Sequence, residues 1–266
     1  MNRSLTFALL LTSIVCNSCA TSPTGKRQLS LVSDNQMTAM GLSAYSDMKK
    51  QIPISTDQRQ TAYVRCIGDA ITSELNDNQQ WEITLFDDEQ INAFALPGGK
   101  IGVYKGLLNV AETPDQLAAV IGHEVAHVRA NHGKARLSAS MAGQAGLLIG
   151  QIALSTSISS SRNRNVMAAL GLGIQFGVLM PYGRGQESEA DIIGLDLLAQ
   201  AGFDPRASTQ LWRNMAAANK GAPPELLSTH PAPSTRIRDL EAQMDKALVL
   251  YRSAQAQGKS PTCQRV

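Results

Sequence analysis

Residues 122–128 contain the motif His-Glu-x-x-His, with His123, Glu124 and His127 at its fixed positions. On a helix, side chains at positions i and i+4 project from the same face, so both imidazoles would reach one point. Two imidazoles placed in this way suit a tetrahedral ion, above all zinc, and Glu124 could take a proton from the attacking water. The motif therefore predicts a zinc-dependent hydrolase, provided that this stretch is a helix.

The residues before the motif predict a helix that starts there. Thr113 is a good N-cap, Pro114 stands at the first helical position, and Gln116 could complete a capping box. Apolar residues then follow helical spacing through the motif. The alternative, an ordinary helix with two histidines and a solvated glutamate, would require half of the chain's four histidines to fall this way by accident.

The N-terminus predicts export from the cytoplasm. Arg3 precedes a short apolar run and then small polar residues, and this run is too short for a comfortable membrane span. We interpret residues 1–18 as a lipoprotein signal, Cys19 as the acylated residue and residues 19–32 as a tether. Simple secretion with cleavage nearby is the alternative. The expected location is the periplasm, with a lipid anchor in the outer membrane.

Charge and cysteine content exclude some partners and leave one question open. The formal net charge is +2, and lysine and arginine are scattered without a basic run, so we expect no nucleic-acid partner. In an oxidising compartment, Cys66 and Cys263 could pair and tie the C-terminal tail, residues 251–266, to an early helix. Two free thiols are the equally open alternative.

The hydrophobic patterns predict a mostly helical α+β fold in one domain, residues 33–250, which would contain the candidate zinc site. A small sheet precedes the motif helix, with strands at 81–86, 91–96 and 100–104. Further helices are expected at 33–50, 57–75, 204–219 and 234–253, with another that enters near Glu187 and ends near Gly202.

Residues 137–180 contain two apolar segments rich in small residues, at 139–154 and 166–180. They could form a transmembrane hairpin. However, each segment is short, and Gln144, Gln151 and Gln175 interrupt them. We therefore prefer a buried helical hairpin near the active site.

A catalytic zinc site needs a third protein ligand and one open position. His132 falls one residue too early for the third histidine of the metzincin pattern, so we expect it at the end of the motif helix. A carboxylate from another helix is the better candidate, and Glu187 leads. Asp191, one turn further on, could hold a ligand imidazole by its second ring nitrogen.

Three ordered motifs give a family resemblance. The His-Glu-x-x-His segment, Glu187-x-x-Ala190-Asp191 and His230-Pro231-x-x-x-x-Arg236 together resemble the gluzincin metallopeptidases that include the CaaX prenyl proteases and HtpX. Residues 92–99, Asn-Ala-Phe-Ala-Leu-Pro-Gly-Gly, match the same family. The resemblance covers about residues 30–245, and the exported start is similar to the soluble periplasmic lipoproteins of that family.

The resemblance implies a zincin-type fold with one zinc ion per chain, bound by His123, His127 and Glu187. It also implies that His230 and Arg236 lie near the site. His230 could donate a hydrogen bond in the transition state, occupy the open zinc position in a latent state, or be a plain loop histidine.

The small sheet suggests where a substrate would lie. A sheet edge beside a zinc-binding helix can accept an extended peptide as an added strand, so we expect Asn92, Ala93 and Phe94 to bind substrate.

We therefore expect a zinc-dependent endopeptidase of the bacterial cell envelope that degrades misfolded or misassembled envelope proteins. One alternative is a chaperone or assembly factor whose metal site is latent, plugged by His230 or by residues 137–180. Another is an integral-membrane protease that uses residues 137–180 as spans. The sequence makes no prediction about the oligomeric state.

Overall fold

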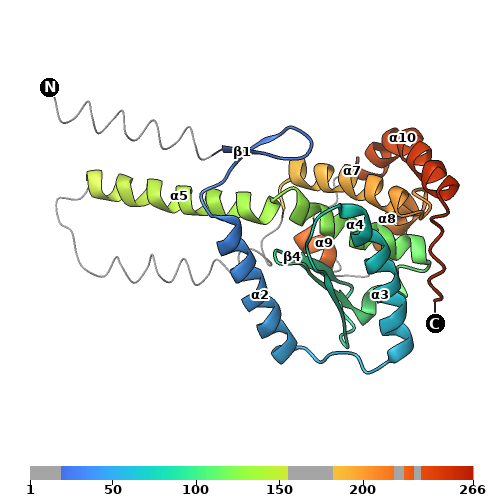
Figure 1. Cartoon of the computed structure of the whole chain (residues 1–266). Coiled ribbons are helices and arrows are strands. Elements are labelled where there is room, and N and C mark those ends of the chain that lie inside the picture. Colours follow the sequence, from blue (N-terminus) through green and yellow to red (C-terminus); the bar gives the residue numbers. More distant parts are fainter. Residues whose placement is uncertain (1–18, 155–181, 219–224, 231–234, 266) are drawn as a thin grey trace. The chain divides into compact units, whose positions relative to one another are not determined.

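A computed structural model describes residues 19–154, 182–218, 225–230 and 235–265 of the chain (Figure 1). The chain divides into two compact units. The smaller comprises Met1–Met37 and Asn131–Leu179, and the larger comprises Thr38–Ala130 and Met180–Val266.

The smaller unit contains a short hairpin and a long helix. Strand β1 (Cys19–Thr21) pairs antiparallel with β2 (Arg27–Leu29), so the segment expected to be a tether contains regular structure. Helix α5 (His132–Leu154) packs near β2, and the Leu31 N–H donates a hydrogen bond to Ser138 Oγ (2.8 Å). Helix α5 covers the first apolar segment of residues 137–180, whereas the second segment lies outside the described residues. Within the described part of the chain, no helix combines the length and the apolar character needed to cross a membrane.

The larger unit is built on a three-stranded sheet in the described residues, with strand order β3-β5-β4. Strand β3 (Glu82–Phe86) is parallel to β5 (Lys100–Tyr104), and β4 (Ala93–Leu96) pairs antiparallel with β5. All three strands were predicted, although β4 begins two residues later than expected.

The two faces of the sheet differ because side chains alternate along each strand. Ile83, Leu85 and Ile101 belong to the main hydrophobic core, which also includes residues of α3 (Gln58–Thr72) and the motif helix α4 (Pro114–Arg129). Aromatic side chains form a cluster on the opposite face of the sheet. Phe94 packs there against Phe86 and Tyr104, and against Tyr45 of α2 (Asp34–Gln51).

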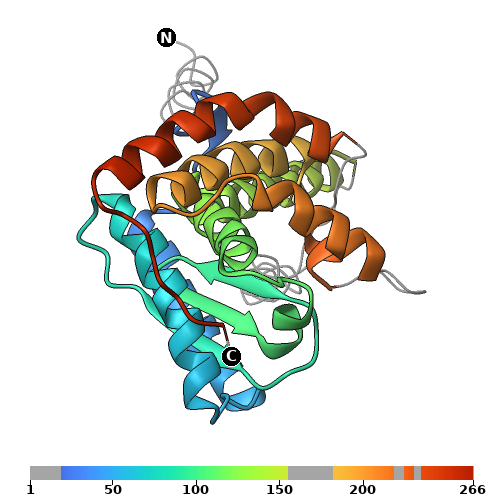
Figure 2. The same ribbon diagram turned by 90° about the vertical axis from the view of Figure 1, so that its right-hand side faces the viewer.

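Helices are layered on the core side of the sheet. Helix α4 contacts β4 and packs against α7 (Arg184–Gln200), which in turn packs against α10 (Arg236–Ala256). Figure 2 shows these layers in the larger unit, from the sheet through α4 and α7 to α10. Helix α8 (Ala207–Ala218) contacts α4 and α10, and the short α9 (Glu225–Thr229) was not predicted. The 3-10 helices η1 (Ser73–Leu75) and η2 (Lys105–Asn109) complete the described elements, and the mostly helical α+β fold is confirmed.

The start of α4 follows the predicted capping, with one change. Thr113 Oγ1 accepts a hydrogen bond from the Gln116 N–H (3.2 Å), and Pro114 occupies the first turn. However, Gln116 Oε1 accepts from the Glu112 N–H (2.7 Å), one residue before the N-cap. The expected capping box is therefore displaced by one residue, and the N-terminus of α4 remains capped by a side chain.

The end of α4 corrects the expectation for His132. Helix α4 ends at Arg129, and Asn131 adopts a left-handed conformation (φ 55°) that asparagine tolerates better than most residues. The helix does not continue through this residue, and His132 begins α5. His132 therefore starts the next helix and does not close the motif helix.

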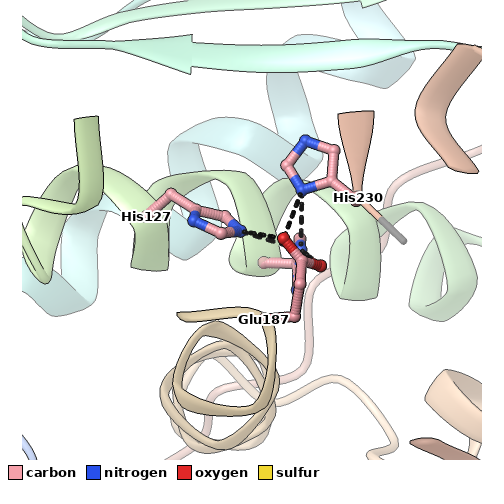
Figure 3. Close-up of side chains that lie close together, drawn as sticks. His127, Glu187 and His230 are labelled. Atoms are coloured by element: carbon pink, nitrogen blue, oxygen red, sulfur yellow. Dashed lines mark hydrogen bonds and ion pairs between the residues drawn. The ribbon is translucent and has the colours of Figure 1, made fainter. Parts of the chain in front are cut away.

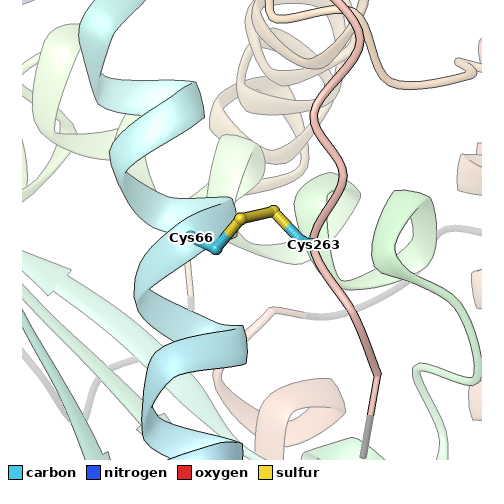
Figure 4. Close-up of a disulfide and its surroundings, with 2 residues drawn as sticks. All are labelled: Cys66 and Cys263. Atoms are coloured by element: carbon cyan, nitrogen blue, oxygen red, sulfur yellow. A yellow bond between two sulfur atoms is a disulfide. The ribbon is translucent and has the colours of Figure 1, made fainter.

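A disulfide between Cys66 and Cys263 fixes the C-terminal tail (Figure 4). It connects α3 to the segment without regular secondary structure that follows α10. Cys66 and Cys263 are therefore paired and are not free thiols. Beyond it, Arg265 donates to the carbonyl oxygens of Leu108 (2.9 Å) and Glu112. The tail is thus fastened to the segment that leads into α4.

Candidate metal centre

Four buried residues from three segments converge in the larger unit. His123 and His127 come from α4, Glu187 from the first turn of α7, and His230 from the residue after α9. Each offers one ligand atom, and these atoms all lie within 4.8 Å of one another. Figure 3 shows His127 and His230 directed at the Glu187 carboxylate. Among the described residues, the groups able to hold a metal here do not include His132.

The donor set and its spacing fit a zinc ion. His123 Nε2 lies 3.1 Å from His127 Nε2 and 3.2 Å from His230 Nδ1. Glu187 Oε2 is 3.4 Å from His123 Nε2, and Glu187 Oε1 is 3.4 Å from His127 Nε2. Neutral imidazole rings can direct the lone pairs of these nitrogens at one common point, and a cation at that point would bind all of them. Three imidazole nitrogens and one carboxylate oxygen are ligand types that zinc takes at such distances from a common centre.

The close approach of α4 and α7 explains why Glu187 reaches the histidines. A Cβ at Gly194 would lie 2.8 Å from the backbone nitrogen of His123, and a Cβ at Gly122 would lie 3.0 Å from the Gly194 oxygen. Two glycines therefore meet where the helices cross, and larger residues would hold the helices apart. Asp191 and Glu187 lie on the same face of α7 as Gly194, one and two turns before it respectively.

Asp191 and Arg236 form a second layer around the ligand cluster. Asp191 Oδ1 lies 3.0 Å from His123 Nδ1, which leaves Nε2 of the same ring facing His127 and the rest of the cluster. Arg236 Nη2 donates to Asp191 Oδ1 (2.6 Å) and to Glu187 Oε2 (3.3 Å). Burial raises the pKa of Asp191, but the Arg236 cation and His123 lower it by more than burial raises it. The pKa of Asp191 is therefore below its ordinary value.

Hydrogen bonds outweigh the effect of burial on the pKa of Glu187 and of His123. Burial raises the pKa of Glu187, but hydrogen bonds with His123 and His230 outweigh it and hold the pKa far below its ordinary range. Burial and Arg236 lower the pKa of His123, whereas the hydrogen bonds to Asp191 and Glu187 raise it to about 9 in the metal-free protein.

Glu124 lies beside this network of hydrogen bonds. It is 3% exposed, and within the described residues its Oε1 makes no hydrogen bond, with His230 Nε2 3.4 Å away. Burial raises the pKa of Glu124. A buried carboxylate oxygen without a donor beside a ligand cluster suits a group that receives a proton from a water molecule.

The charges of the site also fit a divalent cation. The carboxylates of Glu124, Glu187 and Asp191, when ionised, carry three negative charges, and the Arg236 guanidinium carries one positive charge. A divalent ion would neutralise the remaining two. All four of these side chains are at least nine-tenths buried, where uncompensated charge is costly.

The predicted substrate-binding residues lie at an edge of the sheet. The Tyr104 N–H donates to the Asn92 oxygen (3.0 Å), so residues 92, 94 and 96 form the hydrogen-bonded pairs with β5. The backbone groups of Ala93 and Ala95 consequently point away from β5, and Asn92 Oδ1 accepts from the Ala93 N–H (2.9 Å). The Phe94 ring belongs to the aromatic cluster, so its side chain packs the sheet.

Two aromatic residues near the cluster were not found by sequence reasoning. Tyr182 stacks on His127, with ring centroids 3.8 Å apart, and its N–H donates to the Thr229 oxygen (3.0 Å). Trp212 of α8 lies under the Arg236 guanidinium. Neither residue belongs to a recognisable motif, so the sequence contains no local signal for these contacts. The predicted acyl site, Cys19, is exposed at the start of β1.

The fold and this site define a zincin-type metallopeptidase, in which zinc is the resident metal. The chain belongs to peptidase family M48, whose family model matches residues 57–244.

Comparisons with known proteins agree with this family. The chain is 37% identical to the mitochondrial metalloendopeptidase OMA1 of Schizosaccharomyces pombe over 172 residues, 64% of this chain and 48% of that protein. It is 34% identical to OMA1 of Arabidopsis thaliana over 231 residues, 85% of this chain and 45% of that protein. It is 30% identical to the beta-barrel assembly-enhancing protease of Yersinia pestis over 218 residues, 78% of this chain and 44% of that protein. The chain thus spans a little under half the length of these relatives.

Proposed function

We propose that this protein is a zinc-dependent endopeptidase of the bacterial cell envelope that degrades misfolded or misassembled proteins. The observation that carries the proposal is the convergence of His123, His127 and Glu187 beside Glu124, whose Oε1 makes no hydrogen bond with the described residues. The similarity to the beta-barrel assembly-enhancing protease of Yersinia pestis supports an envelope role. Within family M48, we further infer that the chain belongs to the lipoprotein branch of the CaaX protease and HtpX group.

His123, His127 and Glu187 would hold the zinc ion. When bound, zinc supplies a Lewis acid that polarises the scissile carbonyl and acidifies the attacking water. Glu124 accepts a proton from that water and later delivers it to the leaving amine, so the carboxylate is restored at the end of the cycle. Asp191 holds the His123 ring by Nδ1, which directs Nε2 at the metal.

An extended substrate would bind along β4. Ala95 presents both its N–H and its carbonyl at the edge, whereas the Ala93 N–H is already occupied by Asn92. A peptide added as a strand would therefore make its paired hydrogen bonds with Ala95. Because an added strand must be extended, unfolded chains are better substrates than folded ones.

A second function, a protein whose metal site is latent, is favoured by the position of His230. Its Nδ1 lies 3.2 Å from both His123 Nε2 and Glu187 Oε1, within the ligand cluster. A ring in this position would occupy the place that a substrate carbonyl needs. We infer that the arrangement is a resting state and that His230 must withdraw before cleavage. If so, His230→Ala will cleave faster than the parent; a transition-state donor predicts slower cleavage instead.

We infer that Cys19 is the acylated residue of a lipid anchor in the outer membrane. The test is extraction of the full chain from membranes. The parent should require detergent, and Cys19→Ser should be released by salt alone. Equal extraction of the two forms would contradict the anchor.

The experiment that tests the substrate class uses one protein in two states. The parent is given a disulfide-free protein in its folded form and the same protein kept unfolded by substitution of its core. We expect cleavage of the unfolded form only, and none by His127→Ala. Equal cleavage of both forms would contradict selection for unfolded chains, while zinc binding without any cleavage by the parent or by His230→Ala would favour the assembly-factor function.

A further inference from the structure

Trp212 contacts the metal centre without belonging to any motif. The Arg236 Cζ lies 3.5 Å from the centroid of the Trp212 ring, and both residues are buried, at 2% and 7% exposure. The Trp212 and His123 rings form an edge-to-face pair, with centroids 6.0 Å apart and planes at 72°. The indole thus packs against a guanidinium and lies near a ring that could bind metal.

The hydrogen bonds of Arg236 do not fix the plane of its guanidinium. The contacts of Arg236 with Asp191 Oδ1, Glu187 Oε2 and the His123 ring are all made by a single nitrogen, Nη2. Nε and Nη1 are buried, and neither has a hydrogen-bond partner in the described part of the chain. Because these contacts hold only Nη2, the guanidinium could still rotate about that atom. The flat contact with the Trp212 ring supplies the missing constraint, because a cation stacks favourably on an indole face.

The position of this guanidinium matters because it touches two different carboxylates. Its Nη2 holds Glu187 Oε2, while Glu187 Oε1 faces His127 and His230. The same Nη2 holds Asp191, which orients the His123 ring. A displaced guanidinium would release Glu187, the proposed ligand, and Asp191, which orients the ring of His123.

We propose that Trp212 is a positioning residue of the metal centre, which acts by holding Arg236 against Glu187 and Asp191. This inference rests on the ligand assignment proposed above. It predicts that loss of the aromatic face weakens zinc binding even where the fold is intact, and that the effect depends on the positive charge of Arg236.

The test is a zinc titration of the full chain against a coloured chelator, with thermal unfolding measured on the same samples. Trp212→Met should weaken zinc binding by about 2- to 30-fold, the range of a buried cation–π contact. Trp212→Phe retains an aromatic face and should recover most of that loss. Met215→Ala, a buried position of the same helix, should lower the unfolding temperature and leave zinc affinity unchanged.

A double-mutant cycle separates positioning from simple packing. In an Arg236→Met background, Trp212→Met should change zinc affinity by less than about 2-fold, because the stacked cation is absent. An equal loss in both backgrounds, or a parent-like affinity of Trp212→Met, would overturn the proposal. If Trp212→Met does not fold, the same cycle is run with Trp212→Phe, whose smaller loss must also vanish without Arg236.

The ligand assignment is tested separately in the same titration. His127→Ala should lose zinc binding. If His127→Ala binds zinc as tightly as the parent, the ligand assignment fails, whereas a failure confined to the Trp212 variants leaves that assignment standing.

Discussion

Gly194 of α7 lies directly against the backbone of His123 in α4, so closely that a Cβ at Gly194 would be 2.8 Å from the His123 nitrogen. This contact brings the helix that carries Glu187 and Asp191 to the helix that carries both motif histidines. The metal site therefore depends on a backbone contact as well as on its ligands.

Gly194→Ala should separate the two helices. We expect a destabilisation of about 1–3 kcal/mol from overpacking, together with weaker zinc binding, measured by denaturant unfolding and by chelator competition. Gly185→Ala is the matched control in the same helix, because a Cβ at Gly185 meets nothing within 4 Å. That variant should be neutral or stabilised by up to about 1 kcal/mol. Parent-like stability and zinc affinity of Gly194→Ala would contradict this account of the crossing.

The Cys66–Cys263 disulfide joins residues 197 positions apart in the sequence. Its loss restores conformational freedom to the unfolded chain, so Cys66→Ser with Cys263→Ser should destabilise the protein by roughly 2–5 kcal/mol. Denaturant unfolding of the parent with and without reductant provides the comparison, and reductant should leave the double variant unchanged. Recovery of two titratable thiols at these positions from unfolded, unreduced parent would show that the bond does not form.

Substrate pairing with Ala95 predicts a selective effect on KM. Ala95→Pro removes an N–H that β5 does not use, so β4 should still form, as proline is tolerated on edge strands. One lost hydrogen bond should raise KM by about 2- to 10-fold while zinc affinity stays unchanged. Ala95→Ser keeps the N–H and should behave like the parent. A Pro variant with parent-like KM would exclude pairing at Ala95.

Glu82 gives a pH-dependent prediction away from the metal site. Burial raises its pKa, but hydrogen bonds from Lys49 and Lys100 lower it more, so the net pKa is below its ordinary value. A lowered carboxylate pKa contributes stability above the unfolded pKa and loses it as the pH falls. Glu82→Gln should therefore be less stable than the parent at pH 7 by at most about 1 kcal/mol, because these pairs are partly exposed. The difference in unfolding free energy should shrink as the pH falls through the lowered pKa of Glu82, and a difference that does not change with pH would contradict the assignment.

Local sequence signals predicted the parts of the fold that depend on neighbouring residues. The Thr113 cap and the spacing of His123 and His127 act within one helix, and both features are present in α4. His132 was misplaced because its position depends on the backbone conformation of Asn131, which composition does not reveal. Side-chain alternation predicted the strands for the same local reason.

Contacts between distant segments were harder to predict. Glu187 was expected at the site as a carboxylate from another helix, and Arg236 only through the motif resemblance, since no local pattern relates α7 or α10 to α4. The Gly122–Gly194 crossing and the Trp212–Arg236 stack had no motif at all, and they follow from how the helices pack. Sequence patterns thus predicted the candidate ligands, and the packing supplied the residues that position them.

We propose that Glu124 performs proton transfer at a zinc site that binds the metal without its help. The most direct measurement determines zinc content and the rate of cleavage of one unfolded protein for the parent and for Glu124→Gln, side by side. We predict one zinc per chain in both proteins, with cleavage by the variant reduced at least about 100-fold, as expected for loss of a general base. Full cleavage by Glu124→Gln with zinc bound would contradict the mechanism.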